Sequence, residues 1–218
     1  MNGMDTTESR TEGHALTSIT SVVLDVADPV AAQAFYAALG VDHLLSLRES
    51  QAPTSGFRGF TLSVVVAQPA DVDAIVGAAL TAGATSLKPA AKSFWGYGGV
   101  VQAPDGTIWK VASSSKKNTG PANREIDQIV LLLGVSDVRA TKRFYVERGL
   151  TVGKSFGAKY VEFDTPSSTV KLALYGRRAL AKDAGVPEDG TGSHRIVVVG
   201  GTEPFTDPDG FAWEAASA

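Results

Sequence analysis

The stretch VADPVAAQAFYAALGV at residues 26–41 reappears as VSDVRATKRFYVERGLT at residues 135–151, an offset of 109 residues. A second stretch, APDGTIWKVA at residues 103–112, reappears as DPDGFAWEAA at residues 207–216, an offset of 104 residues. Two matched pairs in the same order and at nearly the same offset indicate an internal duplication. Two similar sheets that face each other can enclose a cavity, where a small-molecule site would lie.

Both copies of the first stretch predict a capped helix. Asp28 and Asp137 suit the N-cap position, Pro29 suits the first helical turn, and Gly40 suits the position that ends a helix. Alternating β-branched runs before each copy predict strands. The complete set of expected strands is 18–26, 41–48, 57–67, 86–89, 107–112, 126–135, 151–156, 159–163, 169–175, 193–199 and 211–215, with a second helix at 70–83 and a short one within 176–192.

The repeats divide the chain into two halves. We expect a disordered tail at 1–16, a first domain at 17–112, a polar linker at 113–123 that contains Gly-Pro, and a second domain at 124–218.

Composition excludes several classes of function. The chain of 218 residues has a net charge of −3 and a pI near 5.6, so it has no basic footprint for nucleic acid. It has no cysteine, which excludes a disulfide framework and a thiolate nucleophile. The polar start does not resemble a signal peptide, and no apolar run approaches the roughly 20 residues that span a bilayer. We expect a cytoplasmic protein without a membrane or nucleic-acid partner, present as a monomer or homodimer.

The order of these features resembles a known family. The residues that carry the resemblance are Asp28 with Phe35-Tyr36, Asp137 with Phe144-Tyr145, and the two Pro-Asp-Gly turns. Together they resemble the glyoxalase/bleomycin-resistance/dioxygenase, or vicinal oxygen chelate, superfamily, from about residue 16 to 216. The resemblance implies an α+β fold of tandem βαβββ units, with curved and incompletely closed sheets around a cup, and two glyoxalase-like domains.

The chain departs from that pattern in each half. The first half lacks two strands of its first unit, and the second half lacks room for a helix before its last strand. The two more complete units, at about 56–113 and 124–176, are therefore expected to lean on one another.

Metal-dependent members of the family are expected to bind a divalent ion through the first and last strands of each unit. In the first half these positions fall on Ser21, on Ser63 or Val64, and on Lys110. A cationic lysine opposes a metal and valine cannot ligate, so no metal is predicted in the first half.

In the second half the resemblance places Gln128, His194 and Glu214 at ligand positions. They could hold Zn, Ni, Fe or Mn as a three-ligand site, with Glu214 as ligand or catalytic base. The expected fourth ligand is missing. A register based on the spacing to Asp137 would select Val130 in place of Gln128, and a structural role for each of the three side chains stays open.

A second candidate is the aromatic, glycine-rich segment SFWGYGGVV at residues 93–101. Phe94, Trp95 and Tyr97 offer flat surfaces for a ligand, and glycines let a backbone approach it closely. Core packing around a bulge is the competing explanation.

Three functions follow. The first is a protein that binds a small, largely apolar or aromatic molecule in its cup without a metal. The second is a metal-dependent lyase or dioxygenase of the glyoxalase type that uses Gln128, His194 and Glu214. The third is an interaction module without small-molecule chemistry, whose sheet edges would be covered by a partner.

Overall fold

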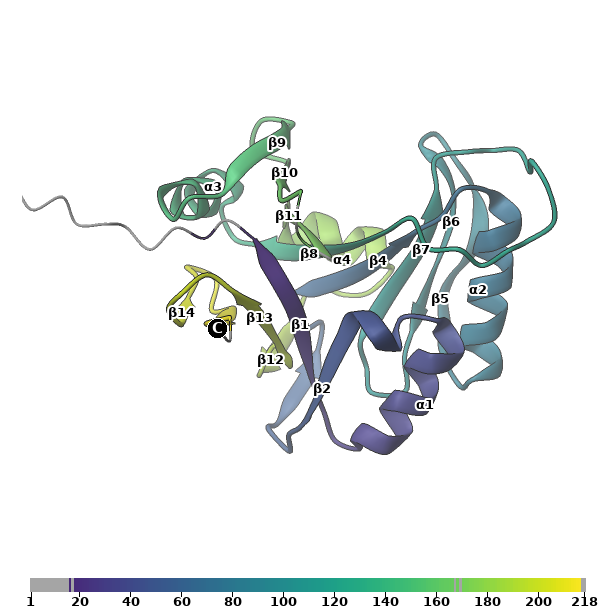
Figure 1. Ribbon diagram of the computed structural model, residues 1–218, viewed down its shortest axis with the longest axis horizontal. Coiled ribbons are helices and arrows are strands. Elements are labelled where there is room, and N and C mark those ends of the chain that lie inside the picture. Colours follow the sequence, from purple (N-terminus) through teal and green to yellow (C-terminus); the bar gives the residue numbers. More distant parts are fainter. Residues whose placement is uncertain (1–15, 17, 167, 169, 217–218) are drawn as a thin grey trace, which may run out of the picture.

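A computed structural model gives the fold (Figure 1) and describes residues 16, 18–166, 168 and 170–216. Apart from Leu16, the predicted tail lies outside the described residues. No helix among the described residues is long and apolar enough to cross a membrane.

The largest sheet has eight strands and joins the two more complete units. Its order is β5-β6-β7-β4-β8-β11-β10-β9. The strands are β4 (Phe60–Val65), β5 (Thr85–Ser93), β6 (Gly96–Gln102), β7 (Ile108–Ser113), β8 (Gln128–Val135), β9 (Thr151–Ser155), β10 (Tyr160–Asp164) and β11 (Val170–Gly176). Antiparallel pairing of β4 with β8 joins the units, as the sequence predicts.

The second sheet is built from the two reduced units. Its order is β14-β15-β13-β1-β2. The strands are β1 (Ile19–Val26), β2 (Leu45–Glu49), β13 (Ile196–Gly200), β14 (Phe205–Thr206) and β15 (Ala212–Glu214). A short ribbon of β3 (Thr54–Gly56) and β12 (Gly190–Gly192) also joins residues from both halves. Each sheet thus takes strands from both predicted halves; the domain boundaries themselves stay a prediction.

The helix signals in the two copies have the expected effect. Helix α1 (Pro29–Leu39) begins after Asp28, whose carboxylate accepts from the amides of Val30 and Ala31, and ends at Gly40 with φ 83°. Helix α3 (Val138–Glu147) is capped in the same way by Asp137. Helix α2 (Pro69–Thr81) and the 3₁₀ turn η1 (Asp42–Leu44) complete this set.

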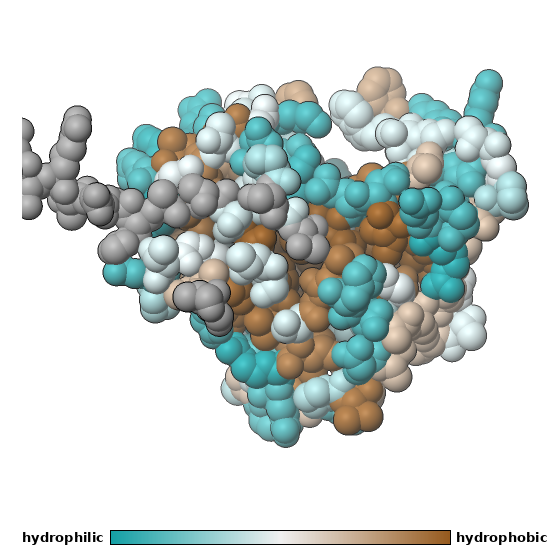
Figure 2. Space-filling model, viewed as in Figure 1, coloured by the Kyte–Doolittle hydropathy of each residue, from teal (hydrophilic) through white to brown (hydrophobic). Residues whose placement is uncertain are grey.

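The main core lies between the two sheets. It contains side chains of β1, β4, β8 and β11 together with the buried faces of α1, α2 and α3. Figure 2 shows apolar residues gathered over the middle of one face, between β1 and the strands β4 and β8, with hydrophilic residues around them. The fold is therefore α+β with curved, incompletely closed sheets, as predicted.

Helix α4 (Arg177–Ala184) lies on the face of the eight-stranded sheet that points away from the main core. It lies between the end of the sheet that carries β9 and β10 and the end that carries β5 and β6 (Figure 1). Leu180, Ala181 and Ala184 belong there to a second, smaller apolar cluster, against which Leu132 of β8 packs. We call the face that α4 covers the cup face. Because cross-strand partners and every second residue share a face, the register of Leu132 fixes which side chains point into the cup.

Candidate functional site

A row of four residues crosses the middle of the cup face. Ser63 of β4 lies opposite Lys110 of β7 and Val130 of β8, and Val130 lies opposite Lys171 of β11. These are the first and last strands of the two units, where the resemblance expects metal ligands. The row offers two ammonium groups, one hydroxyl and an alkyl chain, which do not form a donor set for a divalent ion.

Both lysines of this row are paired with carboxylates. Lys110 Nζ lies 2.7 Å from Asp183 Oδ2 of α4, and Lys171 Nζ lies 3.3 Å from Glu162 Oε1 of β10. Burial would raise the pKa of Glu162, but hydrogen bonds from Tyr160 and Lys171 and the nearby lysine charges outweigh burial and lower it. Both lysines on the cup face therefore form ion pairs with carboxylate side chains.

Among the predicted ligands, only Gln128 lies on this sheet. It is opposite Val65, at the start of β8, and shares the cup face with Val130. His194 lies near the other end of β8. Its Nδ1 is 2.7 Å from the carbonyl oxygen of Arg58. The next residue, Gly59, accepts a hydrogen bond from the amide of Gly134, which is close to the end of β8. The six residue-to-residue steps along β8 from Gln128 to Gly134 span roughly 20 Å.

Both ring nitrogens of His194 face backbone carbonyls. Besides the Arg58 contact, Nε2 lies 3.2 Å from the carbonyl oxygen of Asp209. The ring stacks on Phe211 at 4.0 Å between centroids. These contacts hold the imidazole in place and leave neither nitrogen directed at an open ligand position.

Glu214 is held by an arginine. Its Oε1 lies 2.7 Å from Arg48 Nη1, and Arg48 Nε lies 2.8 Å from Asp25 Oδ1. A guanidinium thus stands beside the carboxylate that the resemblance assigns to a metal. The structure does not bring Gln128 together with His194 and Glu214, and no group of three or more His, Asp or Glu that could hold a metal occurs in the described part of the chain.

The aromatic segment forms the tip of the β5–β6 hairpin. Phe94 and Trp95 are 82% and 83% exposed and meet edge to face at 4.9 Å. Tyr97 donates to Asp73 of α2 at 2.8 Å. A Cβ on Gly98 would lie 2.8 Å from the carbonyl oxygen of Val111, so the neighbouring strand explains that glycine.

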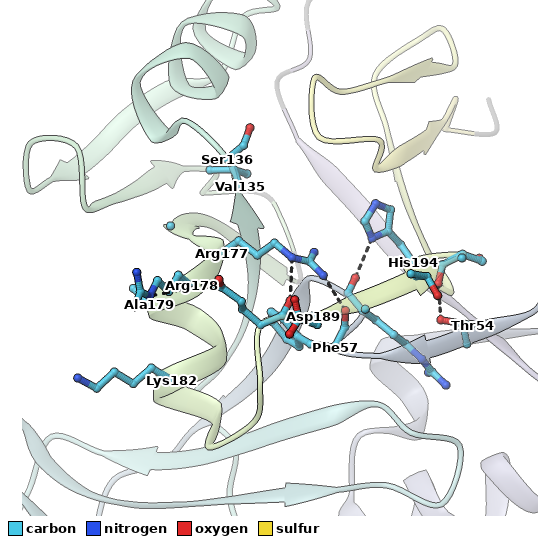
Figure 3. Close-up of a pocket in the computed structure, with 17 residues that line it drawn as sticks. Thr54, Phe57, Val135, Ser136, Arg177, Arg178, Ala179, Lys182, Asp189 and His194 are labelled. Carbon is cyan, nitrogen blue, oxygen red and sulfur yellow. Dashed lines mark hydrogen bonds and ion pairs between the residues drawn. The ribbon is translucent and has the colours of Figure 1, made fainter.

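Helix α4 leaves two cavities beside it. One, of about 350 Å³, lies between α4 and β5–β7 and is lined by Trp95, Tyr97, Lys92 and Lys110 among others. The other, of about 860 Å³, lies at the start of α4 and is shown in Figure 3. Sequence reasoning missed the second cavity; the only signal was the pair Arg177-Arg178 directly after a strand.

The C-terminal end of α4 is attached to the sheet by lysines. Lys88 Nζ donates to the carbonyl oxygens of Lys182 and Asp183, both at 2.7 Å, in addition to the Lys110–Asp183 ion pair. Cations near a helix C-terminus are favourable because they meet the negative end of the helix dipole. The helix is therefore fixed in the cup from the β5 and β7 side.

Solved structures with the same fold include glyoxalase enzymes. The chain matches glyoxalase I from Zea mays with a TM-score of 0.59 at 12% identity, over 92% of this chain and 91% of that one. It matches a Bacillus subtilis protein of inferred dioxygenase function with a TM-score of 0.54 at 11% identity, over 94% and 85% of the two chains. No protein-family profile matches the chain, and no curated protein does.

The chain therefore has the same fold as glyoxalase I, the fold that the sequence resemblance implies. The resemblance in the sequence is confirmed at this level. Identity of 11–12% shows the fold alone, so the site has to be judged from the residues of this chain.

Proposed function

We propose that this protein binds a small, largely apolar or aromatic molecule in its cup and does so without a metal. The observation that carries the proposal is the row of Lys110, Ser63, Val130 and Lys171 across the cup face. Lysines occupy two of the strand positions where the resemblance expects ligands, and an ammonium group cannot coordinate a metal ion.

The cavity between α4 and β5–β7 is the proposed binding site. Its volume of about 350 Å³ lies within the range of small-molecule sites. Trp95 at the hairpin tip supplies aromatic surface, and Lys110 supplies a polar group at the cavity wall. Tyr97 also borders the cavity, but its hydroxyl is directed at Asp73 of α2 on the other face of the sheet. Phe94 supports Trp95 through its edge-to-face contact.

Tryptophan fluorescence tests this site directly. Trp95 is 83% exposed, whereas Trp109 and Trp213 are 0% and 1% exposed, so ligand contact at the hairpin changes the signal of Trp95 first. Aromatic compounds that raise the melting temperature in a thermal-shift panel would be titrated against the protein. We expect saturable changes in fluorescence, and we expect Trp95→Ala to lose the ligand-induced rise in melting temperature without loss of fold.

The matched control is Phe156→Ala, which removes another exposed aromatic ring, 66% exposed, from the turn between β9 and β10 outside this cavity. Binding that survives Trp95→Ala but not Phe156→Ala would contradict the proposed site. Elemental analysis of protein purified without chelators tests the metal-free part. Stoichiometric metal that disappears in Glu214→Ala would restore the Gln128–His194–Glu214 centre and refute the proposal.

A further inference from the structure

The larger cavity lies where two parallel strands end. β8 and β11 run parallel and finish together, with Val135 opposite Gly176. β8 leads into α3, which packs in the main core, whereas β11 leads into α4 on the cup face. When the chains after neighbouring parallel strands diverge to opposite faces, a crevice opens at the carboxyl ends of the strands, and ligands bind in such crevices.

One wall of this cavity is cationic. Arg177, Arg178 and Lys182 of α4 line it, and Figure 3 shows Arg177 reaching across toward His194. The acids at the cavity are Glu188 and Asp189 on the opposite side. Glu188 approaches Arg178 only to 4.0 Å, the outer limit of an ion pair, and the Arg178 side chain is 91% exposed. The cationic groups therefore remain available to an anion.

Arg177 is held in position before any ligand arrives. Its Nε donates to the carbonyl oxygen of Glu188 at 3.2 Å and its Nη2 to that of Phe57 at 2.8 Å. The guanidinium also lies over the Phe57 ring. Gly59 makes room for it, since a Cβ there would lie 2.5 Å from Nη1. Both bonds use neutral carbonyls, so the positive charge has no carboxylate partner within ion-pair distance among the described residues.

The first turn of α4 adds donors to the same cavity. Gly176, Arg177, Arg178 and Ala179 all line it. The N-cap Gly176 provides no side-chain hydrogen bond, in contrast to Asp137 at the start of α3. Uncapped amides at a helix start favour an acceptor with negative charge.

We propose that this crevice is a second ligand site, which binds the oxyanion group (phosphate or carboxylate) of a small molecule through Arg177, Arg178, Lys182 and the first turn of α4. It shares no lining residue with the cavity beside Trp95. The proposal therefore does not depend on the proposed function, and either can fail without the other.

An NMR titration of the full chain tests the site. The probes are inorganic phosphate and benzoate, each added at constant ionic strength against chloride. We expect saturable shifts of the amide signals of Arg178, Ala179 and the ribbon residues 190–192 with at least one probe. The two arms separate a phosphate site from a carboxylate site, and benzoate shifts confined to residues 93–99 would report the Trp95 cavity instead.

The double variant Arg178→Ala/Lys182→Ala removes two exposed cations that no core packing needs. We expect it to weaken binding about tenfold, as the loss of charge-assisted contacts does. Arg143→Ala, an exposed cation on α3 outside this cavity, is the matched control and should change affinity by less than about twofold. Absence of shifts with both probes, or equal affinity in the double variant and the control, would overturn the proposal.

Discussion

The two copies of the duplicated motif use the same aromatic residues but different carboxylates. In the first copy, Tyr36 of α1 donates to Asp105, the central residue of its Pro-Asp-Gly turn, at 2.6 Å. In the second copy, Tyr145 of α3 donates at 2.8 Å to Asp207, which lies two residues before the equivalent turn position. The two matching stretches of sequence thus form two different hydrogen-bond networks.

The turn carboxylate of the second copy is already occupied. Asp209 accepts from the amide of Ser136 at 2.6 Å and from the hydroxyl of Thr141 at 2.8 Å. Asp207 takes its place and accepts from the amides of Asp209 and Phe211 as well as from Tyr145. The second copy therefore has a connected polar network at the helix start.

The first copy has alanine at the matching positions. Ala27, Ala32 and Ala103 correspond to Ser136, Thr141 and Asp207 by the two repeat offsets. A small cavity of about 150 Å³ lies at this place, lined by Ala27, Ala32 and Asp105 among others. The comparison teaches that duplication preserved the aromatic anchor while the polar contacts around it diverged.

The largest expected effect comes from removing the tryptophan of each copy. Trp109 lies 5.7 Å from Tyr36, and Trp213 lies 5.6 Å from Tyr145 between ring centroids. Both are almost fully buried, so replacement by alanine should lower the free energy of unfolding by about 3–5 kcal/mol. Trp213→Ala should fall at the upper end, because Trp213 also donates to Tyr145 and stacks on Phe205.

Urea denaturation followed by circular dichroism measures both losses. A larger loss for Trp109→Ala than for Trp213→Ala would mean that the polar network of the second copy contributes little.

The tyrosines distinguish the two copies at neutral pH. Tyr145 accepts from Trp213 as well as donating to Asp207, so Tyr145→Phe leaves two buried partners unpaired and should cost about 2–3 kcal/mol. Tyr36→Phe removes the bond to Asp105, whereas Trp109 Nε1 has no hydrogen-bond partner to lose, so this change should cost about 1–2 kcal/mol. Equal losses would contradict this difference.

Burial raises the pKa of Tyr36 and Tyr145 well above its usual value, and the neighbouring carboxylates raise it further. The unfolded chain releases these protons near pH 10, whereas the folded protein keeps them. Their contribution to stability is therefore complete below about pH 10 and is lost as the pH rises above it. Unfolding midpoints at increasing alkaline pH should fall less steeply in each phenylalanine variant than in the parent protein.

The sequence predicted the local structure of both copies because its signals are short-range. Asp28 and Asp137 cap their helices through the amides two and three residues onward, and Gly40 has the left-handed conformation that ends α1. Caps, turns and strand alternation depend on a few neighbouring residues, so one sequence is enough to recognise them.

Strand pairing and the place of α4 were harder to predict. Contact between the two more complete units was expected from the sequence. The pairing of β1 with β13 was not, because it joins residues far apart in the chain. Nothing local in residues 177–184 indicates that the helix lies in the cup, because its packing partners come from several distant strands.

The candidate metal site shows the same limit. Matching residues to a family pattern selected Gln128, His194 and Glu214 one by one, and each is placed on a strand or loop near the expected position. His194 and Glu214 line one cavity of about 440 Å³, whereas Gln128 is separated from them because β8 belongs to the other sheet. The pairing of Glu214 with Arg48 depends on contacts across 166 residues. The row of Lys110 and Lys171 could be recognised only once strand register was known.

The smallest expected effects come from exchanging the residues at one position where the two networks differ, Thr141 and Ala32. Thr141→Ala removes the hydroxyl contact to Asp209 and should cost about 1–2 kcal/mol, because a buried bond to a charged group is lost.

The reciprocal change, Ala32→Thr, places a hydroxyl beside Asp105 at the 150 Å³ cavity. The new bond and the filled space should roughly offset the lower helix propensity of threonine, so we expect a change within about 0.5 kcal/mol. Urea denaturation of the two variants measures both changes. A strong destabilisation by Ala32→Thr would show that the first copy has no room for the polar network of the second, and that the two copies differ in packing as well as in hydrogen bonding.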